Sequence, residues 1–470
     1  MIDVSAMTVA RAAAAFRAGR FSPRDLAETY LKRVRELDGA LNSYLTVTSD
    51  AALSAAERAA EELARGIDRG PLHGIPVAYK DLFDTAGVRT TAASRIYAHR
   101  VPDRDAEVVR ALSNAGVVPM GKLNMLEFAY GVVHPDYGPA RNPWNLERSS
   151  GGSSSGSAVA VAAGLCLAAL GSDTGGSIRM PAAWCGVVGF KPTYDLVSRA
   201  GVVPLSWSLD HVGPLTRTAY DAALMLEAMA ERPDGIRDRG RGFQAAALDD
   251  VDVPHLRIGV PRQLLDTGVD DAVRRVVEDA LSDLAECGMA VEDVSLGDAD
   301  DILAAELTIL FAEASAFHIR WLRERAEDYA PLTRDRLEAG IAIPAVHYIN
   351  ALRAREAIVG AFRDVFRNVD LVALPSAPTT AIRLDETSLS INGAPVDIFR
   401  GLIRITGPFN LTGTPAISVP CGCAPDGLPV GLQLAGPWHA DHVVLAAARA
   451  FEERRAAPLR LPPLGEHLRR

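Results

Sequence analysis

Cysteine is scarce in this chain of 470 residues. The five cysteines are Cys166, Cys185, Cys287, Cys421 and Cys423. Their number is odd, no C-x-x-C occurs, and the spacing of Cys421 and Cys423 is too short for the usual zinc pair. We therefore expect reduced thiols and a cytoplasmic protein.

Long apolar runs are also missing, and no leader sequence is expected. No stretch of about 18 apolar residues occurs, so no membrane span is expected. The N-terminal segment 1–20 is rich in alanine, but Arg11 and Arg17 interrupt it and no basic segment precedes an apolar core. This pattern predicts a helix and not a signal peptide.

Positive charge and metal-binding patterns are weak as well. A net charge of −10 argues against a broad nucleic-acid surface, so we expect a small-molecule partner and no direct contact with nucleic acid. The ten histidines form no H-E-x-x-H motif and no tight cluster, so neither a metal nor another cofactor is expected. The net charge does not exclude a local basic pocket that binds a small acidic substrate. The sequence also does not exclude a Ser-His-Asp triad, although no particular histidine stands out.

Segments with the patterns of helices and strands alternate along the chain. Ser22 and Pro23 should begin a helix that ends just before Gly39, and a second helix is expected at 50–65. "GIPVAYK", "VVPMGKLN" and "LRIGVP" have the pattern of buried strands, so the alternation predicts an α/β sheet. The polar segment 231–242 should be a surface loop within a single domain of residues 1–470, because the same patterning continues on both sides.

The stretch "SSGGSSSGSA" at 149–158 has two opposite interpretations, a flexible linker or an active-site loop. It contains the pattern G-x-S-x-G, with Ser154 in the nucleophile position of a strand–turn–helix elbow. The following "SAVAVAAG" provides the helix, but the preceding "NPWNLERSS" is not an apolar strand. The sequence therefore argues against Ser154 as an elbow nucleophile.

Ser177 has surroundings better suited to a nucleophile. It follows the buried-strand candidate "LCLAALG" and two glycines, whose backbone N–H groups could stabilise an oxyanion. Asp173 and Arg179 flank this loop and could brace it as a charge pair. Lys80 is the best candidate base, because it ends an apolar run where desolvation favours a neutral amine. A glycine turn without function, and a lysine paired with Asp81, are the alternatives that these residues leave open.

A phosphate-binding loop is a further candidate at "GVVPMGKL", residues 116–123. Leu123 stands where the motif needs Ser or Thr to hold magnesium. The segment is therefore expected to be a strand that leads into a turn.

Residues 151–193 carry a longer pattern, which resembles the signature of the amidase signature family. Its parts are "GGSSSGS", then "GSDTGGSIRMP", then "CGVVGFKPT". Blocks such as "GIPVAYKD", "GKLNMLEFAYG", "TGPFNLTGTPAISVP" and "GLPVGLQLAG" extend the resemblance over essentially the whole chain. It implies one α/β domain with a central mixed sheet covered by helices on both faces, and a signature core at about 70–220.

The resemblance also implies the site residues. The Ser-cisSer-Lys triad of the family falls on Ser177 as nucleophile, Ser153 as bridging serine after a cis Gly152–Ser153 bond, and Lys80 as base. The further residues are Thr174, Gly175, Gly176 and Ser177 for an oxyanion hole of backbone N–H groups, Asp173 and Arg179 as supports, and Ala129 and Tyr130 as lining of the acyl pocket.

The implied activity is cleavage of a carboxamide C–N bond through a serine acyl-enzyme, which releases ammonia or an amine and a carboxylate. The A subunits of aminoacyl-tRNA amidotransferases usually carry an Asp in "GKTNMDEFAMG", where this chain has Leu126. We therefore expect a free-standing amidase. A glutaminase-type A subunit, a urea-type hydrolase of biuret or allophanate-like substrates, and an inactive scaffold are the alternatives. The oligomeric state stays open, a homodimer included.

Overall fold

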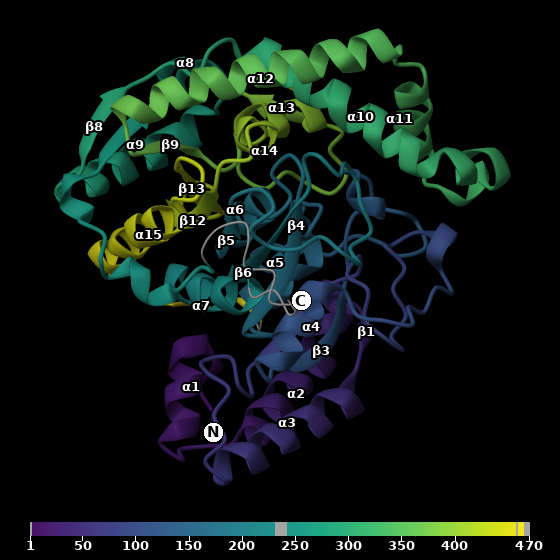
Figure 1. Ribbon diagram of the computed structural model, residues 1–470, viewed down its shortest axis with the longest axis vertical. Helices are drawn as coiled ribbons and strands as arrows, with labels where there is room; N and C mark the ends of the chain where they lie inside the picture. The colour runs from purple at the N-terminus through teal and green to yellow at the C-terminus, as the bar shows by residue number, and fades with distance from the viewer. Residues whose placement is uncertain (1, 231–241, 457–458, 465–470) are drawn as a thin grey trace.

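The protein is seen here as a computed structural model that describes residues 2–230, 242–456 and 459–464 (Figure 1). All but one residue of the loop expected at 231–242 lies outside the described residues. An 11-stranded sheet runs through the fold in the order β1-β3-β2-β4-β6-β5-β12-β13-β9-β7-β8, and β10 and β11 form a separate ribbon. The predicted α/β domain with a central mixed sheet is confirmed.

The strands are short, as is usual for a twisted sheet of this size. They are β1 Tyr44–Val47, β2 Pro76–Lys80, β3 Val118–Leu123, β4 Ala168–Asp173, β5 Val188–Lys191, β6 His211–Thr216, β7 Arg257–Val260, β8 Ala290–Asp293, β9 Leu371–Pro375, β10 Ser388–Ile391, β11 Ala394–Asp397, β12 Ala416–Cys423 and β13 Pro429–Ala435.

Helices connect these strands and cover the sheet. They are α1 Val9–Arg17, α2 Pro23–Leu41, α3 Ser49–Ala64, α4 Glu107–Asn114, α5 Ser155–Ala162, α6 Arg179–Cys185, α7 Ala219–Met229, α8 Arg262–Thr267, α9 Asp271–Glu286, α10 Ala299–Glu324, α11 Pro331–Ile341, α12 Ala345–Asn368, α13 Ile398–Thr406, α14 Pro408–Leu411 and α15 Asp441–Arg455.

The start of α2 follows from its sequence, and its end does not. Ser22 and Asp25 form a reciprocal capping box around Pro23, as the N-cap pattern predicts. The helix continues through Gly39 to Leu41 and ends where Asn42 adopts a left-handed conformation. The predicted end just before Gly39 is therefore wrong, and the extra residues carry the helix to Leu41, which is buried in the core.

Strand pairing brings two distant segments to one edge of the sheet. β2 pairs in parallel with β4, with Tyr79 opposite Leu170. Parallel strands end at the same edge, so Lys80 at the end of β2 lies close to Ser172 near the end of β4. The sheet thus aligns two segments about ninety residues apart along the chain, as the separation of Lys80 and Ser172 shows.

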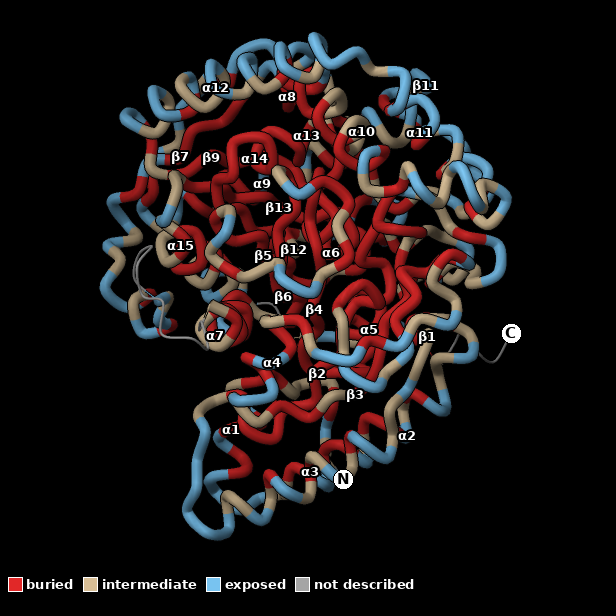
Figure 2. Tube along the Cα trace, turned by 45° about the vertical axis from the view of Figure 1, so that its right-hand side comes forward, coloured by how far each residue is buried: buried red, intermediate tan, exposed pale blue. Residues whose placement is uncertain are grey.

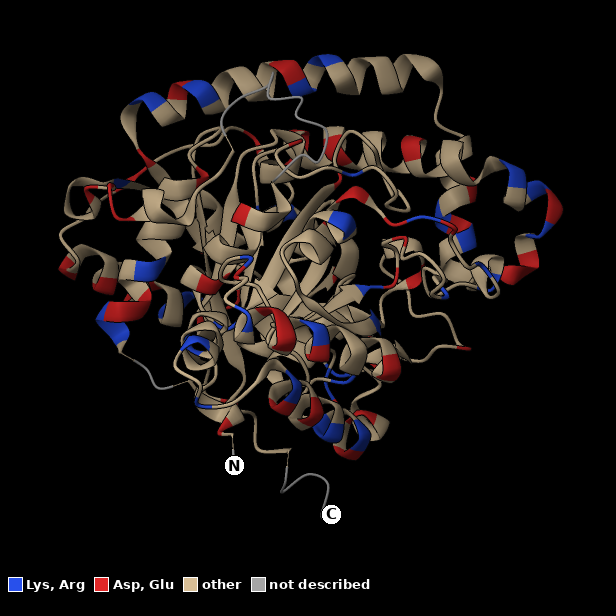
Figure 3. Ribbon diagram, turned by 60° about the horizontal axis from the view of Figure 1, so that its bottom comes forward, with Lys and Arg blue, Asp and Glu red and all other residues tan. Residues whose placement is uncertain are grey.

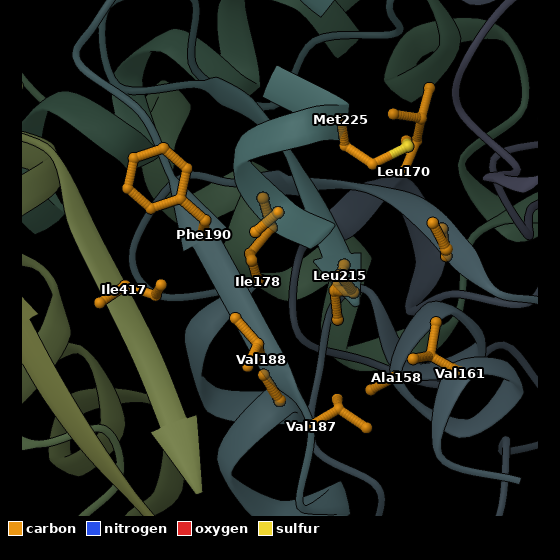
Figure 4. Packing of buried hydrophobic residues seen from close by; sticks show 14 of the residues in the cluster. Ala158, Val161, Leu170, Ile178, Val187, Val188, Phe190, Leu215, Met225 and Ile417 are labelled. Atoms are coloured by element: carbon orange, nitrogen blue, oxygen red, sulfur yellow. The ribbon is translucent and has the colours of Figure 1, made fainter. Parts of the chain in front are cut away.

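The core around these strands is apolar and closely packed. Every residue of α5 is buried, as expected for a helix that is apolar on all sides. Ala158 and Val161 of α5 belong to the cluster that also contains Leu170 of β4 and Leu215 of β6 (Figure 4). α5 and α6 contact each other, while α7, α9 and α15 form a second group of helices against the sheet.

Exposure and charge increase towards the outer helices. α12 buries only Ala351 and Phe362 and runs along the surface (Figure 2). Most charged side chains lie on such outer helices and loops, and the strands of the central sheet carry few of them (Figure 3). α10 is long and apolar enough to span a membrane, but 56% of its most apolar window is buried inside the fold, as in a core helix. A charged side chain inside the sheet is therefore an exception that needs a cause.

Gly156 should tolerate no side chain. A Cβ there would lie 2.4 Å from the carbonyl oxygen of Ser43 and 2.6 Å from the backbone of Asn124. We expect Gly156→Ala to lower the free energy of unfolding by about 1–3 kcal/mol through overpacking. Gly360→Ala on α12 is the control, because a Cβ there meets nothing within 4 Å, and it should stabilise by roughly 0.5–1 kcal/mol. Urea unfolding of both variants measures the difference, and equal stability would contradict this packing.

Candidate active site

Lys80 lies inside a ring of three serine hydroxyls. Its Nζ is 2.7 Å from Oγ of Ser153, 2.8 Å from Oγ of Ser172 and 3.0 Å from Oγ of Ser154. The lysine is fully buried, and its neighbour Asp81 is bonded to Thr91 instead. The alternative of a lysine that reaches solvent or pairs with Asp81 is therefore wrong.

The surroundings of Lys80 favour its neutral form. Burial lowers the pKa of Lys80 to about 7, although the nearby Asp173 and Asp210 act in the opposite direction. Asp210 accepts hydrogen bonds from Thr174 Oγ1 at 2.7 Å and from the backbone of Ser206, and burial raises the pKa of its carboxyl to about 6. The amine thus has a pKa suited to a general base near neutral pH.

The loop that carries Ser153 lies against the loop that carries Ser177. The Gly152–Ser153 peptide bond is cis, as the resemblance implies. The backbone N–H of Ser154 donates to the carbonyl oxygen of Ser177 at 3.1 Å. α5 begins directly after this loop at Ser155, so the stretch is neither a linker nor an elbow preceded by a strand.

Asp173 and Arg179 form a buried ion pair that organises the loop between them. Nη2 of Arg179 is 2.9 Å from Oδ1 of Asp173, and both side chains are fully buried. The carboxylate also accepts the backbone N–H of Gly176 at 2.7 Å and of Ile178 at 3.0 Å. Burial alone would raise the pKa of Asp173, but the Arg179 guanidinium, the nearby Lys191 and a hydrogen bond from the Asn410 amide hold it well below its usual range.

The remaining donors of Arg179 reach the C-terminal part of the chain. Nη1 donates to the carbonyl oxygen of Thr406 at 2.9 Å and to Oε1 of Gln433 at 2.6 Å, and Nη2 donates to Oδ1 of Asn410. The amide of Asn410 in turn donates to Oδ1 of Asp173 at 2.8 Å. A buried charge is tolerated when it is paired and fully hydrogen-bonded, and this one meets both conditions.

Gly176 is glycine for two reasons. Its φ is +121°, and a Cβ there would lie 2.2 Å from Oγ1 of Thr406. Its N–H, which was expected to be one of four oxyanion donors, is donated to Asp173 in this structure. Within the loop 174–177, the backbone N–H groups of Thr174, Gly175 and Ser177 have no acceptor among the described residues.

A cavity of about 300 Å³ opens beside Ser172. Ala129 lines it, together with Trp207 at 48% exposure. Tyr130 is fully buried, with its ring edge-on to Phe311. The structure thus brings Ala129 to the cavity and places Tyr130 in the aromatic core.

Several residues of this site were not predicted. They are Ser172, Asp210, Thr406, Asn410 and Gln433. Each lies in or beside a block that resembles the family, so a signal existed, but only the fold shows what these side chains touch. Leu126, at which the sequence differs from the usual amidotransferase pattern, lies beside this site. Its side chain would be 2.2 Å from a Cβ on Gly152. Leu126 therefore packs directly on the serine loop.

Comparison with known proteins agrees with this geometry. The family model described as Amidase matches residues 25–445. The A subunit of the glutamyl-tRNA(Gln) amidotransferase of Moorella thermoacetica is 40% identical over 94% of this chain and 96% of its own length. The peptide amidase of Stenotrophomonas maltophilia has a TM-score of 0.83 at 31% identity, over 97% of this chain and 98% of its own.

A third similar protein is a solved structure described as an unexpected vestigial protein complex that reveals the origins of an s-triazine catabolic enzyme. Its TM-score is 0.91 at 34% identity, and the match covers 97% of this chain and all of that one, 100%.

These relatives correct one expectation and weaken another. The expectation of no direct contact with nucleic acid is contradicted, because the relatives include subunits of glutamyl-tRNA(Gln) amidotransferases. The comparisons also favour the alternative of an amidotransferase component over the expected free-standing amidase. The family match spans most of the chain, and this protein belongs to the amidase signature family of enzymes that cleave C–N bonds.

Proposed function

We propose that this chain hydrolyses a carboxamide through an acyl-enzyme on Ser177, with Ser153 and Lys80 as the proton relay. The observation that carries the proposal is the buried Lys80 amine, 2.7 Å from Ser153 Oγ. Ser177 attacks the amide carbon and passes its proton to Ser153, which passes its own to Lys80. The same path returns a proton to the leaving amine, and water then hydrolyses the acyl-enzyme to a carboxylate.

The hydroxyls around Lys80 support this direction of transfer. Ser154 donates its hydroxyl hydrogen to the carbonyl oxygen of Ser172 at 3.1 Å, so its oxygen is free to accept from Lys80. A neutral amine has two N–H groups and one lone pair. With Ser154 and Ser172 accepting the two N–H groups, the lone pair is left for the hydroxyl of Ser153.

Ser177→Ala should abolish hydrolysis, with a loss of about 10³-fold or more in kcat, because no nucleophile remains. Ser154→Ala removes one hydrogen bond to Lys80 and the two that link Ser154 to the backbone of Ser172, but it leaves the nucleophile in place, so we expect a loss of about 10-fold. An active-site-directed fluorophosphonate should label the wild-type chain and the Ser154 variant but not Ser177→Ala. Full amide hydrolysis by Ser177→Ala would exclude this mechanism.

The relay should give a pH dependence with a limb near neutrality. The pKa of Lys80 is lowered by burial to about 7, so the amine is protonated and inactive below this pH and free to accept a proton above it. The rate of fluorophosphonate labelling should therefore rise with pH through about 7 and then level off. A rate that stays constant over this range, or a midpoint near the ordinary pKa of lysine, would contradict the role of Lys80.

We further propose that the chain acts as the amide-hydrolysing component of a larger enzyme. This rests on the relatives that are 37–41% identical over nearly the full chain and are named as subunits of glutamyl-tRNA(Gln) amidotransferases. In such an enzyme the ammonia released at Ser177 would be the product that a partner protein uses.

The chain should accordingly co-purify with a partner protein from its own cells. Ammonia release from glutamine should rise at least about 10-fold when that partner is present, as expected when binding orders a site. The control is the same complex with Ser177→Ala, which should assemble but release no ammonia. Full activity of the isolated chain on glutamine or another amide, with no partner recovered, would favour the free-standing amidase instead.

A further inference from the structure

Glu306 on α10 is a carboxyl group without a partner. Its side chain is fully buried, and neither Oε1 nor Oε2 has a hydrogen-bond partner among the described residues. Glu313, two turns further along the same helix, shows the usual condition of a buried acid. Its Oε2 accepts from Ser206 Oγ at 2.6 Å and its Oε1 accepts from Tyr348 at 2.9 Å.

The other buried acids of the chain resemble Glu313. Within the ranges that the structure describes, Glu306 is the one buried acid whose two oxygens both lack a partner. The other buried acids all accept hydrogen bonds, and examples are Asp173, Asp210, Asp221, Asp441 and Glu127. An unsatisfied buried polar group is costly and rare in folded proteins, so its presence calls for a reason.

The position of Glu306 gives that reason. Its Oε1 would be 3.4 Å from a Cβ on Gly175, which is two residues before Ser177 in the candidate oxyanion loop. On its other side the carboxyl packs on Gly407, where a Cβ would lie 2.0 Å from Oε2. Glycine at both positions leaves no side chain between the carboxyl and the backbone of the loop. Ile403 is the apolar neighbour at the same place, 3.1 Å from the Cβ position of Gly175.

We propose that Glu306 determines specificity by binding an N–H group in the acyl part of the amide substrate. This deepens the function proposed above and rests on it, because the acyl part must lie next to the oxyanion loop when Ser177 attacks. A substrate with such a group supplies the partner that the free protein lacks. A substrate with a methyl or methylene group in its place would leave a buried carboxyl unpaired, which is the strongest source of discrimination that a polar site has.

The charge state of the carboxyl favours a neutral N–H group. Burial raises the pKa of Glu306 well above its ordinary value, and Asp173 raises it further while Arg179 and Arg355 lower it. A protonated carboxyl donates one hydrogen bond and accepts another, which matches the side-by-side C=O and N–H of an amide or ureido group. An ammonium group, such as that of glutamine, would need the ionised form instead. The amide or ureido group and the ammonium group both offer an N–H donor, but only the ammonium group is charged.

The test measures binding to the full-length Ser177→Ala chain, so that no turnover is needed. Isothermal titration calorimetry compares two matched pairs of ligands. Succinamide has a second amide where 4-oxopentanamide has a methyl ketone, and glutamine has an amino group that 4-carbamoylbutanoate lacks. We expect tighter binding of the N–H-bearing member in at least one pair, by about 10- to 100-fold. The pair that discriminates tells whether the group is neutral or an ammonium.

Variants at Glu306 assign the preference to this residue. In the same background Glu306→Leu should bring the ratio of dissociation constants close to one, by weakening only the N–H-bearing ligand. Glu306→Gln should keep a preference for succinamide and lose any preference for glutamine, and it replaces the Leu variant if that one does not fold. Glu313→Gln is the matched control, because it alters an acid of the same helix that is already satisfied, and its ratio should stay unchanged.

The outcomes separate this proposal from the assignment of the nucleophile. No preference within either pair, weak binding of all four ligands included, would overturn the role of Glu306. An equal loss for all ligands in Glu306→Leu would also overturn it and indicate a purely structural residue. Because the measurement needs no catalysis, these results do not depend on Ser177, whereas hydrolysis by Ser177→Ala would exclude the mechanism and leave the binding ratios intact.

Discussion

The removal of Lys80 from water is the constraint on which the rest of the site depends. An amine in solution would be protonated at neutral pH and could not accept a proton. Here burial lowers its pKa to about 7, and three serine hydroxyls replace the lost water without adding a negative charge. A carboxylate in their place would stabilise the charged amine and remove its basicity. The serine-rich loop therefore gives the buried lysine uncharged hydrogen-bond partners.

The ion pair of Asp173 and Arg179 fulfils a different requirement. It joins the end of β4 to α6, and through Thr406, Asn410 and Gln433 it reaches segments more than two hundred residues further along the chain. A cross-link of this kind fixes the loop that carries Ser177 between strand and helix. The carboxylate also accepts the N–H of Gly176 and of Ile178, so it holds the backbone of the loop on both sides of Ser177. The rigidity of the loop thus comes from the pair and not from the glycines.

The sequence contained enough information for the fold class and for most of the site, but in two different ways. The alternation of strands and helices indicated an α/β sheet, whereas the pairing of β2 with β4 was not visible in any local pattern. Lys80 stood out because a charge at the end of an apolar run is unusual. Ser172 and Asn410 did not stand out, because polar residues are ordinary until the fold shows that they are buried and whom they contact. Leu126 misled for the same reason, since one apolar residue beside the serine loop says little about partner proteins.

Lys80 and Glu306 are two buried groups with different proposed roles in the site. Lys80 is surrounded by hydroxyls and has its hydrogen-bond partners before any substrate arrives, as the proposed proton relay requires. Glu306 has no partner among the described residues, although it lies against Gly175 of the candidate oxyanion loop. If Glu306 had only a structural role, an acid with hydrogen-bond partners, such as Glu313, would give a lower free energy of the folded state at that position too. Chemistry that is common to all substrates can be built in advance, whereas recognition of one substrate requires a group that only this substrate satisfies.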